Sequence, residues 1–360
     1  MYNAYLCNRE EKHEKMKVVA DCDIPFLAGV LEPYAEVKYI KGAEIGADDV
    51  RDADALLIRT RTLCDERLLA GSRVRFIGTA TIGTDHIDLP YCADRGIAVR
   101  SAAGCNARGV LQWMAAVLVL LLRKYGMRPR ETVLGVIGVG NVGGLVIRYA
   151  RQWGYRVLCC DPLRRRAESL GPEDGFVDMR RLLENADIVT LHTPLTAEGE
   201  YATSGMIGAE AFGMMKNGSV LINCARGGIV DEEALLEAVG CGKVAGCAID
   251  TWADEPDINR RLLCASDVAT PHIAGYSVQG KAAGTSMTVR ALARFFGFGP
   301  LSDWYPEDAP VSMPRDISWS DVSANIVRYF DIDSQSGMLK RHPEKFEEMR
   351  NGYHYREEFF

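Results

Sequence analysis

Three residues in the second half of the sequence have the types and the order that acid–base chemistry on an organic acid needs. Arg226, Glu255 and His272 each lie at or just beyond the carboxyl end of an apolar run. A guanidinium can bind a carboxylate through two parallel hydrogen bonds, and an imidazole exchanges protons near neutral pH. A carboxylate close to that imidazole fixes its tautomer and favours its protonated form. Together the three side chains could hold a carboxylate and move a hydroxyl proton.

Each of the three residues also has an ordinary structural explanation when it is taken alone. An arginine after a strand usually forms a surface ion pair, Glu-Pro is a common turn, and a lone histidine is more often structural. Ligands of open parallel sheets, however, lie at the carboxyl ends of the strands. Three such residues after three successive strand ends therefore predict a catalytic group, with Arg226 for the carboxylate, His272 as the base and Glu255 to tune it.

A glycine motif earlier in the chain predicts a dinucleotide site. The apolar run TVLGVI is followed by GVGNVG, which has the spacing G-x-G-x-x-G between a strand and a helix. In that context the glycines permit a tight turn, the approach of a pyrophosphate, and close packing of the helix on the strand. Asp161, at the end of YRVLCCD, suits hydrogen bonds to the ribose hydroxyls. The residues predicted to bind the dinucleotide here are Gly138, Gly140, Asn141, Val142, Gly143 and Asp161.

NAD is the predicted cofactor and NADP is the alternative. Arg164, Arg165 and Arg166 follow the aspartate closely, and an arginine near this position can hold the 2′-phosphate of NADP. An aspartate at the strand end would repel that phosphate. We therefore expect NAD, and a comparison of turnover with the two cofactors would decide.

Apolar runs alternate with helix-like stretches along the chain, which predicts an α/β fold with two parallel sheets. The later series describes a doubly wound (Rossmann) NAD domain, and the earlier one a flavodoxin-like substrate domain. Helices are expected near 25–34, 104–124, 142–153, 231–239 and 277–296, and about two more in the last 46 residues. The expected strands are KVVAD, EVKYI, ALLIRT, RFIGTAT, IAVRSA, TVLGVIG, YRVLCCD, ADIVTLHT, SVLINCA, KVAGCAID and DVATPH.

The expected domain boundaries follow these patterns. They are a tail over 1–15, a substrate domain over 16–105 and 275–300, an NAD domain over 106–274, and a linker with a C-terminal dimerisation segment over 301–360. Four prolines between 300 and 314 give that stretch the composition of a linker. A segment as small as the last one rarely folds alone, so we expect it to dock on its own subunit or on a partner subunit.

Composition places the chain among ordinary globular proteins. Of its 360 residues, 48% are hydrophobic and 25% are charged, and the net charge is -7. This charge gives no general attraction to nucleic acid or to an anionic membrane. The longest apolar run, 113–122, is shorter than the roughly 18 residues of a membrane span, and no secretion signal is expected. Eleven cysteines without a C-x-x-C pair indicate a reducing cytoplasm and no metal site.

The motifs GVGNVG, HTPL, NCARGG, VDEEAL, DTWADEP and TPHIAGY resemble those of the D-2-hydroxyacid dehydrogenase family. The resemblance implies an NAD-dependent oxidoreductase in which Arg226 and Glu255 are catalytic and His272 accepts and donates the proton. Besides the glycine loop and Asp161, it places around NAD the residues Thr193, Cys224, Ala225, Arg226, Asp250 and Gly275. It places Thr60, Thr81 and Tyr276 near the substrate.

Further motifs resemble family members that act on a phosphorylated 2-hydroxy acid and form homodimers. These motifs are FIGTATIGTDHID, AAGCNA and ATPHIAGYSVQGKA, together with a short C-terminal extension. The far phosphate needs a cation, and Arg59, after ALLI, is the predicted one, with a structural ion pair as the equal alternative. Three features depart from the family pattern: Thr60 stands where serine is frequent, Gln112 where glutamate is usual, and the tail after Pro314 is shorter than the family's dimerisation domain.

Two other functions stay open at this point. One is another member of the same family, of the 3-phosphoglycerate, glyoxylate or D-lactate type, against which the character of the tail argues. The other is a binding protein that senses the nicotinamide cofactor and keeps these residues without turnover. Oxidation of a phosphorylated 2-hydroxy acid would separate both from the first expectation.

Overall fold

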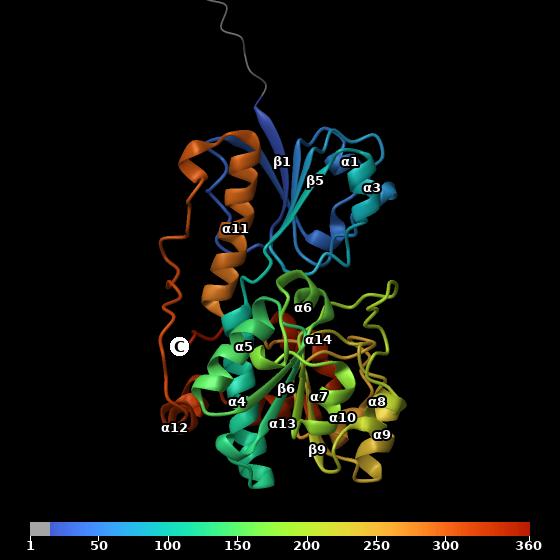
Figure 1. Ribbon diagram of the computed structural model, residues 1–360. Coiled ribbons are helices and arrows are strands. Elements are labelled where there is room, and N and C mark those ends of the chain that lie inside the picture. The colour runs from blue at the N-terminus through green and yellow to red at the C-terminus, as the bar shows by residue number, and fades with distance from the viewer. Residues whose placement is uncertain (1–14) are drawn as a thin grey trace, which may run out of the picture. The chain divides into compact units, whose positions relative to one another are not determined.

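The computed structural model describes residues 15–360 and divides into two compact units (Figure 1). Unit 1 contains the described residues up to Ala103 together with Ala282–Glu307, and unit 2 contains Gly104–Lys281 and Asp308–Phe360. Except for Lys15, the predicted tail over 1–15 lies outside the described residues.

Unit 1 is built on a five-stranded parallel sheet with the strand order β2-β1-β3-β4-β5. Val18 and Ala20 face one side of this sheet, where α11 packs, and Val19 faces the other, where α1, α2 and α3 pack (Figure 1). The strands are β1 (Met16–Asp21), β2 (Ala35–Ile40), β3 (Ala55–Ile58), β4 (Phe76–Thr79) and β5 (Ala98–Ser101). The helices are η1 (Gly42–Glu44), α1 (Ala47–Val50), α2 (Glu66–Leu69), α3 (Leu89–Asp94), α11 (Val278–Phe296), which begins in unit 2, and η4 (Gly299–Leu301).

The helix expected over 25–34 is wrong, because this stretch is a succession of turns. Leu27 and Leu31 are both buried, and their spacing of four residues imitates one face of a helix. The backbone, however, takes positive φ angles at Phe26 (62°) and Gly29 (85°), which no α-helix allows. The side chain of Glu32 then closes the turn by accepting a hydrogen bond from the Gly29 amide at 3.0 Å.

Unit 2 is built on a six-stranded parallel sheet with the order β11-β10-β9-β8-β6-β7. Phe176 adds an isolated parallel bridge beside Cys159 of β7, which extends the sheet at that edge. The chain thus leaves β6 toward β7 and returns to β8 on the other side, so the strand order reverses at β6. The strands are β6 (Val133–Ile137), β7 (Arg156–Cys160), β8 (Ile188–Leu191), β9 (Ser219–Asn223), β10 (Val244–Ile249) and β11 (Val268–Ala269).

Helices cover both faces of this sheet, and the predicted α/β fold is confirmed (Figure 1). Residues of α4 and α5 pack on one face and residues of α7 to α10 on the other. The expected strand DVATPH is reduced to two residues, since Pro271 has no amide to donate. The helices are α4 (Ala107–Tyr125), η2 (Pro129–Glu131), α5 (Asn141–Gln152), α6 (Pro162–Glu168), η3 (Pro172–Asp174), α7 (Met179–Asn185), α8 (Ala209–Met214), α9 (Glu232–Gly240) and α10 (Arg260–Ala265).

The C-terminal segment wraps around unit 2 with three α-helices, one more than expected. It contains α12 (Trp319–Tyr329), α13 (Ile332–Arg341), η5 (Pro343–Lys345) and α14 (Phe346–Asn351). Helix α12 packs against α4, and α13 lies along the edge strand β11, where the Ser336 hydroxyl accepts a hydrogen bond from the Ala269 amide at 2.9 Å. Phe346 then joins the core on the second face, while Phe359 and Phe360 return to the first. The segment therefore docks on its own subunit.

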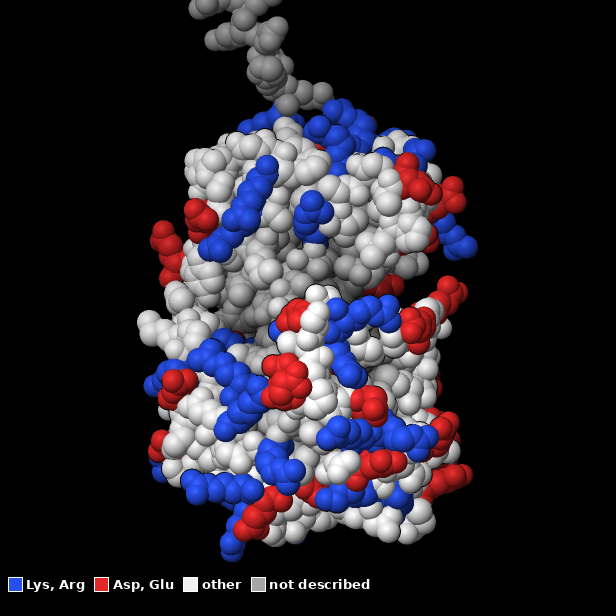
Figure 2. Space-filling model, viewed as in Figure 1, with Lys and Arg blue, Asp and Glu red and all other residues white. Residues whose placement is uncertain are grey.

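The helices, the surface charges and the cysteines of the described residues bear on the expectations from composition. No helix within the described residues is long and apolar enough to cross a membrane. On the face shown in Figure 2, Lys and Arg side chains of unit 2 are interspersed with Asp and Glu, so neither sign forms an extended patch there. The ten cysteines that the structure describes are all free thiols.

Candidate active site

The glycine loop follows β6, at the point where the strand order of the unit 2 sheet reverses. Gly138 has a φ of 86°, and a Cβ atom there would lie 2.7 Å from Thr193 Cγ2. A Cβ atom at Gly143 would overlap the carbonyl oxygen of Gly138, whereas one at Gly140 would meet nothing within 4 Å. The first and third glycines are thus required by the fold, and the second leaves open space at the N-terminus of α5. This arrangement fits a dinucleotide whose pyrophosphate approaches the backbone at Gly140.

Asp161 ties this loop to the end of the neighbouring strand. One carboxylate oxygen accepts a hydrogen bond from the Val139 amide at 2.9 Å, and the other caps α6 by accepting from the Arg164 amide at 2.9 Å. The Arg164 guanidinium is held by the Val139 carbonyl at 2.8 Å and by Glu168 at 2.9 Å. The arginine that could take a 2′-phosphate is therefore already engaged.

Two residues after β8 line the same loop. The Thr193 hydroxyl is buried and lacks a hydrogen-bond partner among the described residues, a state that suits a bound polar ligand. Next to it, His192 Nε2 lies 3.1 Å from the Thr190 hydroxyl, and its Nδ1 lies 3.9 Å from Cys224 Sγ. Burial lowers the pKa of His192 to about 3, so this imidazole stays neutral. Sequence reasoning missed His192, although it belongs to the motif HTPL.

The loop after β9 presents Arg226. The side chain of Asn223 shapes this loop, since it accepts a hydrogen bond from the Ala225 amide at 3.1 Å and donates one to the Arg226 carbonyl at 3.0 Å. A Cβ atom at Gly227 would overlap the carbonyl oxygen of Trp252. The loop that carries Arg226 is therefore in direct backbone contact with the loop that leads to Glu255.

Asp250, at the end of β10, organises the loop that carries His272. Its buried carboxylate accepts hydrogen bonds from the Thr270 hydroxyl at 2.5 Å and from the amides of Ile273 at 2.9 Å and Ala274 at 3.0 Å. Burial raises the pKa of Asp250, with the nearby His272 and these hydrogen bonds acting against it. The same loop holds His272 at a φ of 57°, a conformation that costs a residue other than glycine about 1–3 kcal/mol.

His272 and Glu255 form a close pair at this edge of the sheet. His272 Nδ1 lies 2.8 Å from Glu255 Oε2 and 3.0 Å from Oε1. The Trp252 amide donates a further hydrogen bond to Oε1 at 3.1 Å. Burial would raise the pKa of Glu255, but the contacts with His272 and Trp252 and the charge of Arg350 together lower it. An ionised Glu255 places the imidazole proton on Nδ1 and leaves Nε2 as the proton acceptor.

Two basic residues, one beside Glu255 and one beside Tyr276, were not predicted from the sequence. Arg350, on α14, lies 3.4 Å from Glu255 Oε2. Lys281 lies 3.8 Å from the ring centre of Tyr276, the predicted substrate residue, whose ring also meets Tyr353 and Tyr355 edge-on. Gly275 has no space for a side chain, because a Cβ atom would overlap the side chain of Asn106.

The other predicted substrate residues lie in unit 1, at the carboxyl ends of β3 and β4. Arg59 donates a hydrogen bond to the Asp23 carbonyl at 3.0 Å, so it is partly engaged within its own unit. Thr60 is exposed, and the Thr81 hydroxyl lies 2.6 Å from that of Thr79.

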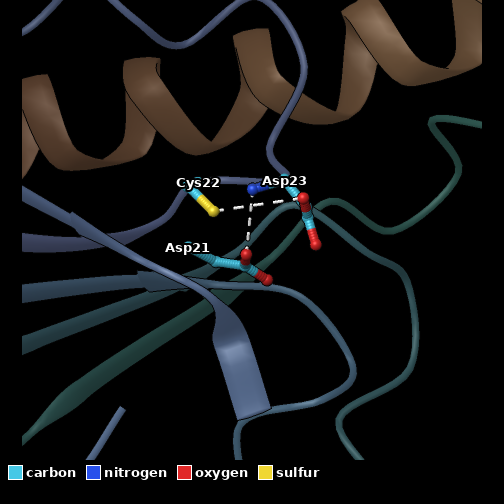
Figure 3. Close-up of side chains that lie close together, drawn as sticks. All are labelled: Asp21, Cys22 and Asp23. Atoms are coloured by element: carbon cyan, nitrogen blue, oxygen red, sulfur yellow. Dashed lines mark hydrogen bonds between the residues drawn. The ribbon is translucent and has the colours of Figure 1, made fainter. Parts of the chain in front are cut away.

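A small group of potential metal ligands lies beside the Arg59 contact. Figure 3 shows that Asp21, Cys22 and Asp23 turn their ligand atoms toward one another at the end of β1. Asp21 is buried and its carboxylate accepts hydrogen bonds from the amides of Asp23 at 3.0 Å and Gly42 at 3.2 Å. These bonds give Asp21 a role in the turn, and we assign no metal to the group.

Comparison with known proteins places this geometry in a family. The model of the D-isomer specific 2-hydroxyacid dehydrogenase NAD binding domain matches residues 113–274. Over 345 residues the chain is 41% identical to the erythronate-4-phosphate dehydrogenase of Bacteroides fragilis, a match that covers 95% of this chain and 97% of that protein. It is 39% identical over 344 residues to the enzyme of the same name from Porphyromonas gingivalis, covering 94% and 92% of the two chains.

Solved structures of the same family have a similar fold. A D-lactate dehydrogenase from Aquifex aeolicus, complexed with NAD and lactic acid, is 25% identical with a TM-score of 0.65, over 83% of this chain and all of that one. An NAD+-bound 3-phosphoglycerate dehydrogenase from Entamoeba histolytica is 26% identical with a TM-score of 0.66, over 81% of this chain and 98% of that one. The chain therefore belongs to the D-isomer specific 2-hydroxyacid dehydrogenases and is an NAD-dependent oxidoreductase that acts on a CH–OH group.

Proposed function

We propose that this enzyme oxidises 4-phospho-D-erythronate to (R)-3-hydroxy-2-oxo-4-phosphooxybutanoate in the biosynthesis of pyridoxal 5′-phosphate. The observation that carries the reaction class is the His272–Glu255 pair, 2.8 Å apart at the strand ends of a dinucleotide-binding sheet. The observation that favours this substrate is the 41% identity to an erythronate-4-phosphate dehydrogenase over nearly the whole length of both chains.

The residues of unit 2 divide the chemistry at C2 between them. The Arg226 guanidinium binds the C1 carboxylate and so fixes C2 in place. Nε2 of His272 accepts the proton of the C2 hydroxyl, while Glu255 holds the Nδ1 proton and stabilises the imidazolium that forms. The glycine loop, Asp161 and Thr193 would hold NAD, which would supply the acceptor for the hydride of C2. The C2–H and O–H bonds break, and the C2–O bond becomes a carbonyl.

The phosphate end of the substrate needs a cation, and we assign this role to Arg59 of unit 1. Arg59 follows β3, and Thr60 and Thr81 follow strand ends of the same sheet. The hydrogen bond to the Asp23 carbonyl uses one of the five N–H donors of the Arg59 guanidinium and does not involve the other four.

We further propose a homodimer in the cytoplasm, with the C-terminal segment as the subunit contact. Val327 and Tyr329 on α12 are 46% and 48% exposed, and Val311 and Met313 on the preceding linker are 62% and 78% exposed. Because these apolar side chains of the C-terminal segment are exposed, we take them as the candidate subunit contact. A dimer in sedimentation equilibrium that Val327→Asp converts to a monomer would support this contact. The ten free thiols suit a reducing compartment.

A substrate panel tests the proposed function. Acids with a 2-hydroxy group, with and without a terminal phosphate, are assayed with NAD and with a 2-oxo acid present as acceptor for the reduced cofactor. We expect 4-phosphoerythronate to give the highest kcat/KM. A higher value with D-lactate, glyoxylate or 3-phosphoglycerate substrates would assign the chain to another member of the family, and no turnover at all would favour a cofactor-sensing protein.

Two variants test the assigned residues. His272→Ala should abolish turnover and leave NADH binding unchanged. Arg59→Ala should lower kcat/KM for phosphorylated acids far more than for unphosphorylated ones, and an equal loss with both would remove Arg59 from the phosphate site.

A further inference from the structure

The C-terminal segment contributes a charge to the catalytic pair. Nη1 of Arg350, in the last turn of α14, lies 3.4 Å from Glu255 Oε2. The two side chains are only 17% and 16% exposed, so solvent screens their attraction less than that of a surface pair. A guanidinium close to a carboxylate favours the ionised form of that carboxylate.

The contacts of Glu255 leave its carboxylate little freedom. Oε1 lies 3.1 Å from the Trp252 amide and 3.0 Å from His272 Nδ1. Oε2 lies 2.8 Å from Nδ1 and faces Arg350. Each carboxylate oxygen of Glu255 therefore has two partners. Among these partners, Arg350 is the residue that lies outside the loops after β10 and β11. Removal of Arg350 would free Oε2 on the side away from the imidazole.

Other residues of the same segment hold the backbone that follows His272. The buried guanidinium of Arg356 donates hydrogen bonds to the carbonyls of Ile273 at 3.0 Å and Tyr276 at 3.1 Å, and also to that of Ala274. A further bond to Gly109 at 2.8 Å and the ring of Phe330, 4.3 Å away, fix Arg356 itself. The segment therefore grips the loop after His272 close to the point where Arg350 meets Glu255.

Gln112 on α4, which stands where the family usually has glutamate, also contacts the C-terminal segment. Gln112 is buried and donates a hydrogen bond to the Glu357 carbonyl at 3.2 Å. Its amide donates where a glutamate would repel the carbonyl. This contact anchors the end of the chain that carries Arg350 and Arg356.

We propose that Arg350 is a positioning residue of the active site, which holds the Glu255 carboxylate ionised and aligned with His272 Nδ1. The C-terminal segment is then part of the catalytic machinery of its own subunit, in addition to its role as the proposed subunit contact. The proposal rests on the acid–base roles given to Glu255 and His272 under the proposed function.

The charged surroundings of the pair bear on its pH dependence. Asp250, directly after β10, faces His272. Glu347 and the Tyr276 hydroxyl lie close to Arg350. Glu255 faces both His272 and Arg350. Loss of the positive charge at position 350 removes one of the groups that lower the pKa of Glu255. Protonation of Glu255 then begins at a higher pH, so the acidic limb of the activity profile should move upward.

The experiment compares Arg350→Gln and Arg350→Lys with Arg341→Gln, an exposed arginine at the end of the neighbouring helix α13. We expect Arg350→Gln to lower kcat/KM by about 10- to 100-fold, as misplacement of a catalytic group does. Its acidic limb should lie at higher pH, its NADH affinity should be unchanged, and Arg350→Lys should recover part of the loss. Arg341→Gln should behave as the wild type.

A double-mutant cycle shows whether Arg350 acts through Glu255. If it does, Arg350→Gln should lower kcat/KM only a little in a Glu255→Gln background, because the side chain that Arg350 positions is already neutral there. Equal losses in both backgrounds, or a loss of activity that parallels a loss of NADH binding with an unmoved pH profile, would overturn the proposal. Should Arg350→Gln not fold, the same cycle is made with Arg350→Lys, which keeps the charge and shifts its position.

The outcome is separable from that of the proposed function. The positioning effect is expected with every 2-hydroxy acid that the wild type oxidises, because it acts at C2 and not at the phosphate. Failure to oxidise 4-phosphoerythronate would refute the proposed substrate and leave Arg350 to be tested on whichever acid is turned over. Turnover of 4-phosphoerythronate with no effect at Arg350 would refute the inference alone.

Discussion

Gly227 and Trp252 are in backbone contact, and no side chain of any size fits at position 227 because its Cβ atom would overlap the Trp252 carbonyl oxygen. Gly227 directly follows Arg226, and the Trp252 amide donates a hydrogen bond to Glu255. The contact therefore sets the spacing between the guanidinium that we propose to bind the substrate carboxylate and the carboxylate that we propose to tune the base.

Gly227→Ala should consequently damage both stability and catalysis. Relief of the overlap has to push the two loops apart, and overpacking of this kind typically costs about 1–3 kcal/mol. We expect a lower midpoint in urea unfolding and a lower kcat/KM, with both losses arising from one displacement. Gly213→Ala is the matched control, because a Cβ atom there meets nothing within 4 Å and alanine favours the helix α8. If Gly227→Ala changes neither the unfolding midpoint nor kcat/KM, the two loops can move apart without cost.

The glycine loop makes a second prediction, because its second and third glycines are constrained differently. Gly143→Ala should lower stability and NADH affinity together, since the Cβ atom overlaps the Gly138 carbonyl. Gly140→Ala should keep the unfolding midpoint and lose NADH affinity, since the methyl group fits the protein but stands where the pyrophosphate approaches. Calorimetric unfolding and fluorescence titration with NADH measure the two properties. If Gly140→Ala binds NADH as the wild type does, the cofactor does not approach at Gly140.

The parallel sheets and the residues at their strand ends could be predicted because both depend on local pattern. The alternation of apolar residues and the turn residues that follow it mark the end of a strand. Arg226, Glu255 and His272 follow three successive strand ends. A local pattern misleads where tertiary contacts decide the backbone conformation. Leu27 and Leu31 have helical spacing, yet Phe26 and Gly29 adopt positive φ angles and the stretch is a series of turns.

Long-range contacts set the other limit. Arg350 meets Glu255 across 95 positions of the chain, and nothing in the sequence around Arg350 distinguishes it from an exposed arginine of a terminal helix. Likewise, the resemblance placed Asp250 beside NAD, and the structure adds that its carboxylate binds the amides of Ile273 and Ala274. Such roles depend on which groups meet in space, and a local sequence pattern does not reveal those contacts.

The lowered pKa of His192 predicts a specific dependence of stability on pH. Its pKa is lowered to about 3 in the folded protein by burial, against about 6.5 for an ordinary histidine. Between these values the unfolded chain binds more protons, so the stability that depends on neutral His192 is complete above about pH 6.5 and is lost as pH falls toward 3. His192→Asn should flatten the slope of unfolding free energy against pH in this range. The control is His354→Asn, at an exposed position. An unchanged slope in His192→Asn would mean that this imidazole accepts a proton in the folded state.

The contacts of Asp161 and Arg164 predict how cofactor preference can be changed. The Asp161 carboxylate repels a 2′-phosphate, and Glu168 keeps the Arg164 guanidinium engaged at 2.9 Å. Asp161→Ser should lower NADH affinity and narrow the preference for NADH over NADPH, because it removes the charge and keeps a hydroxyl that can cap α6.

Addition of Glu168→Gln should improve NADPH binding further, because the positive charge of Arg164 is then no longer neutralised by its partner. Fluorescence titration with both reduced cofactors measures the two affinities. Glu200→Gln is the matched control, since it removes an exposed partner of Arg166 in the same way. If Asp161→Ser and the double variant keep the wild-type ratio of affinities, the choice between NAD and NADP is made elsewhere in the site. If the control variant shifts the ratio as much as Glu168→Gln does, net charge rather than Arg164 is responsible.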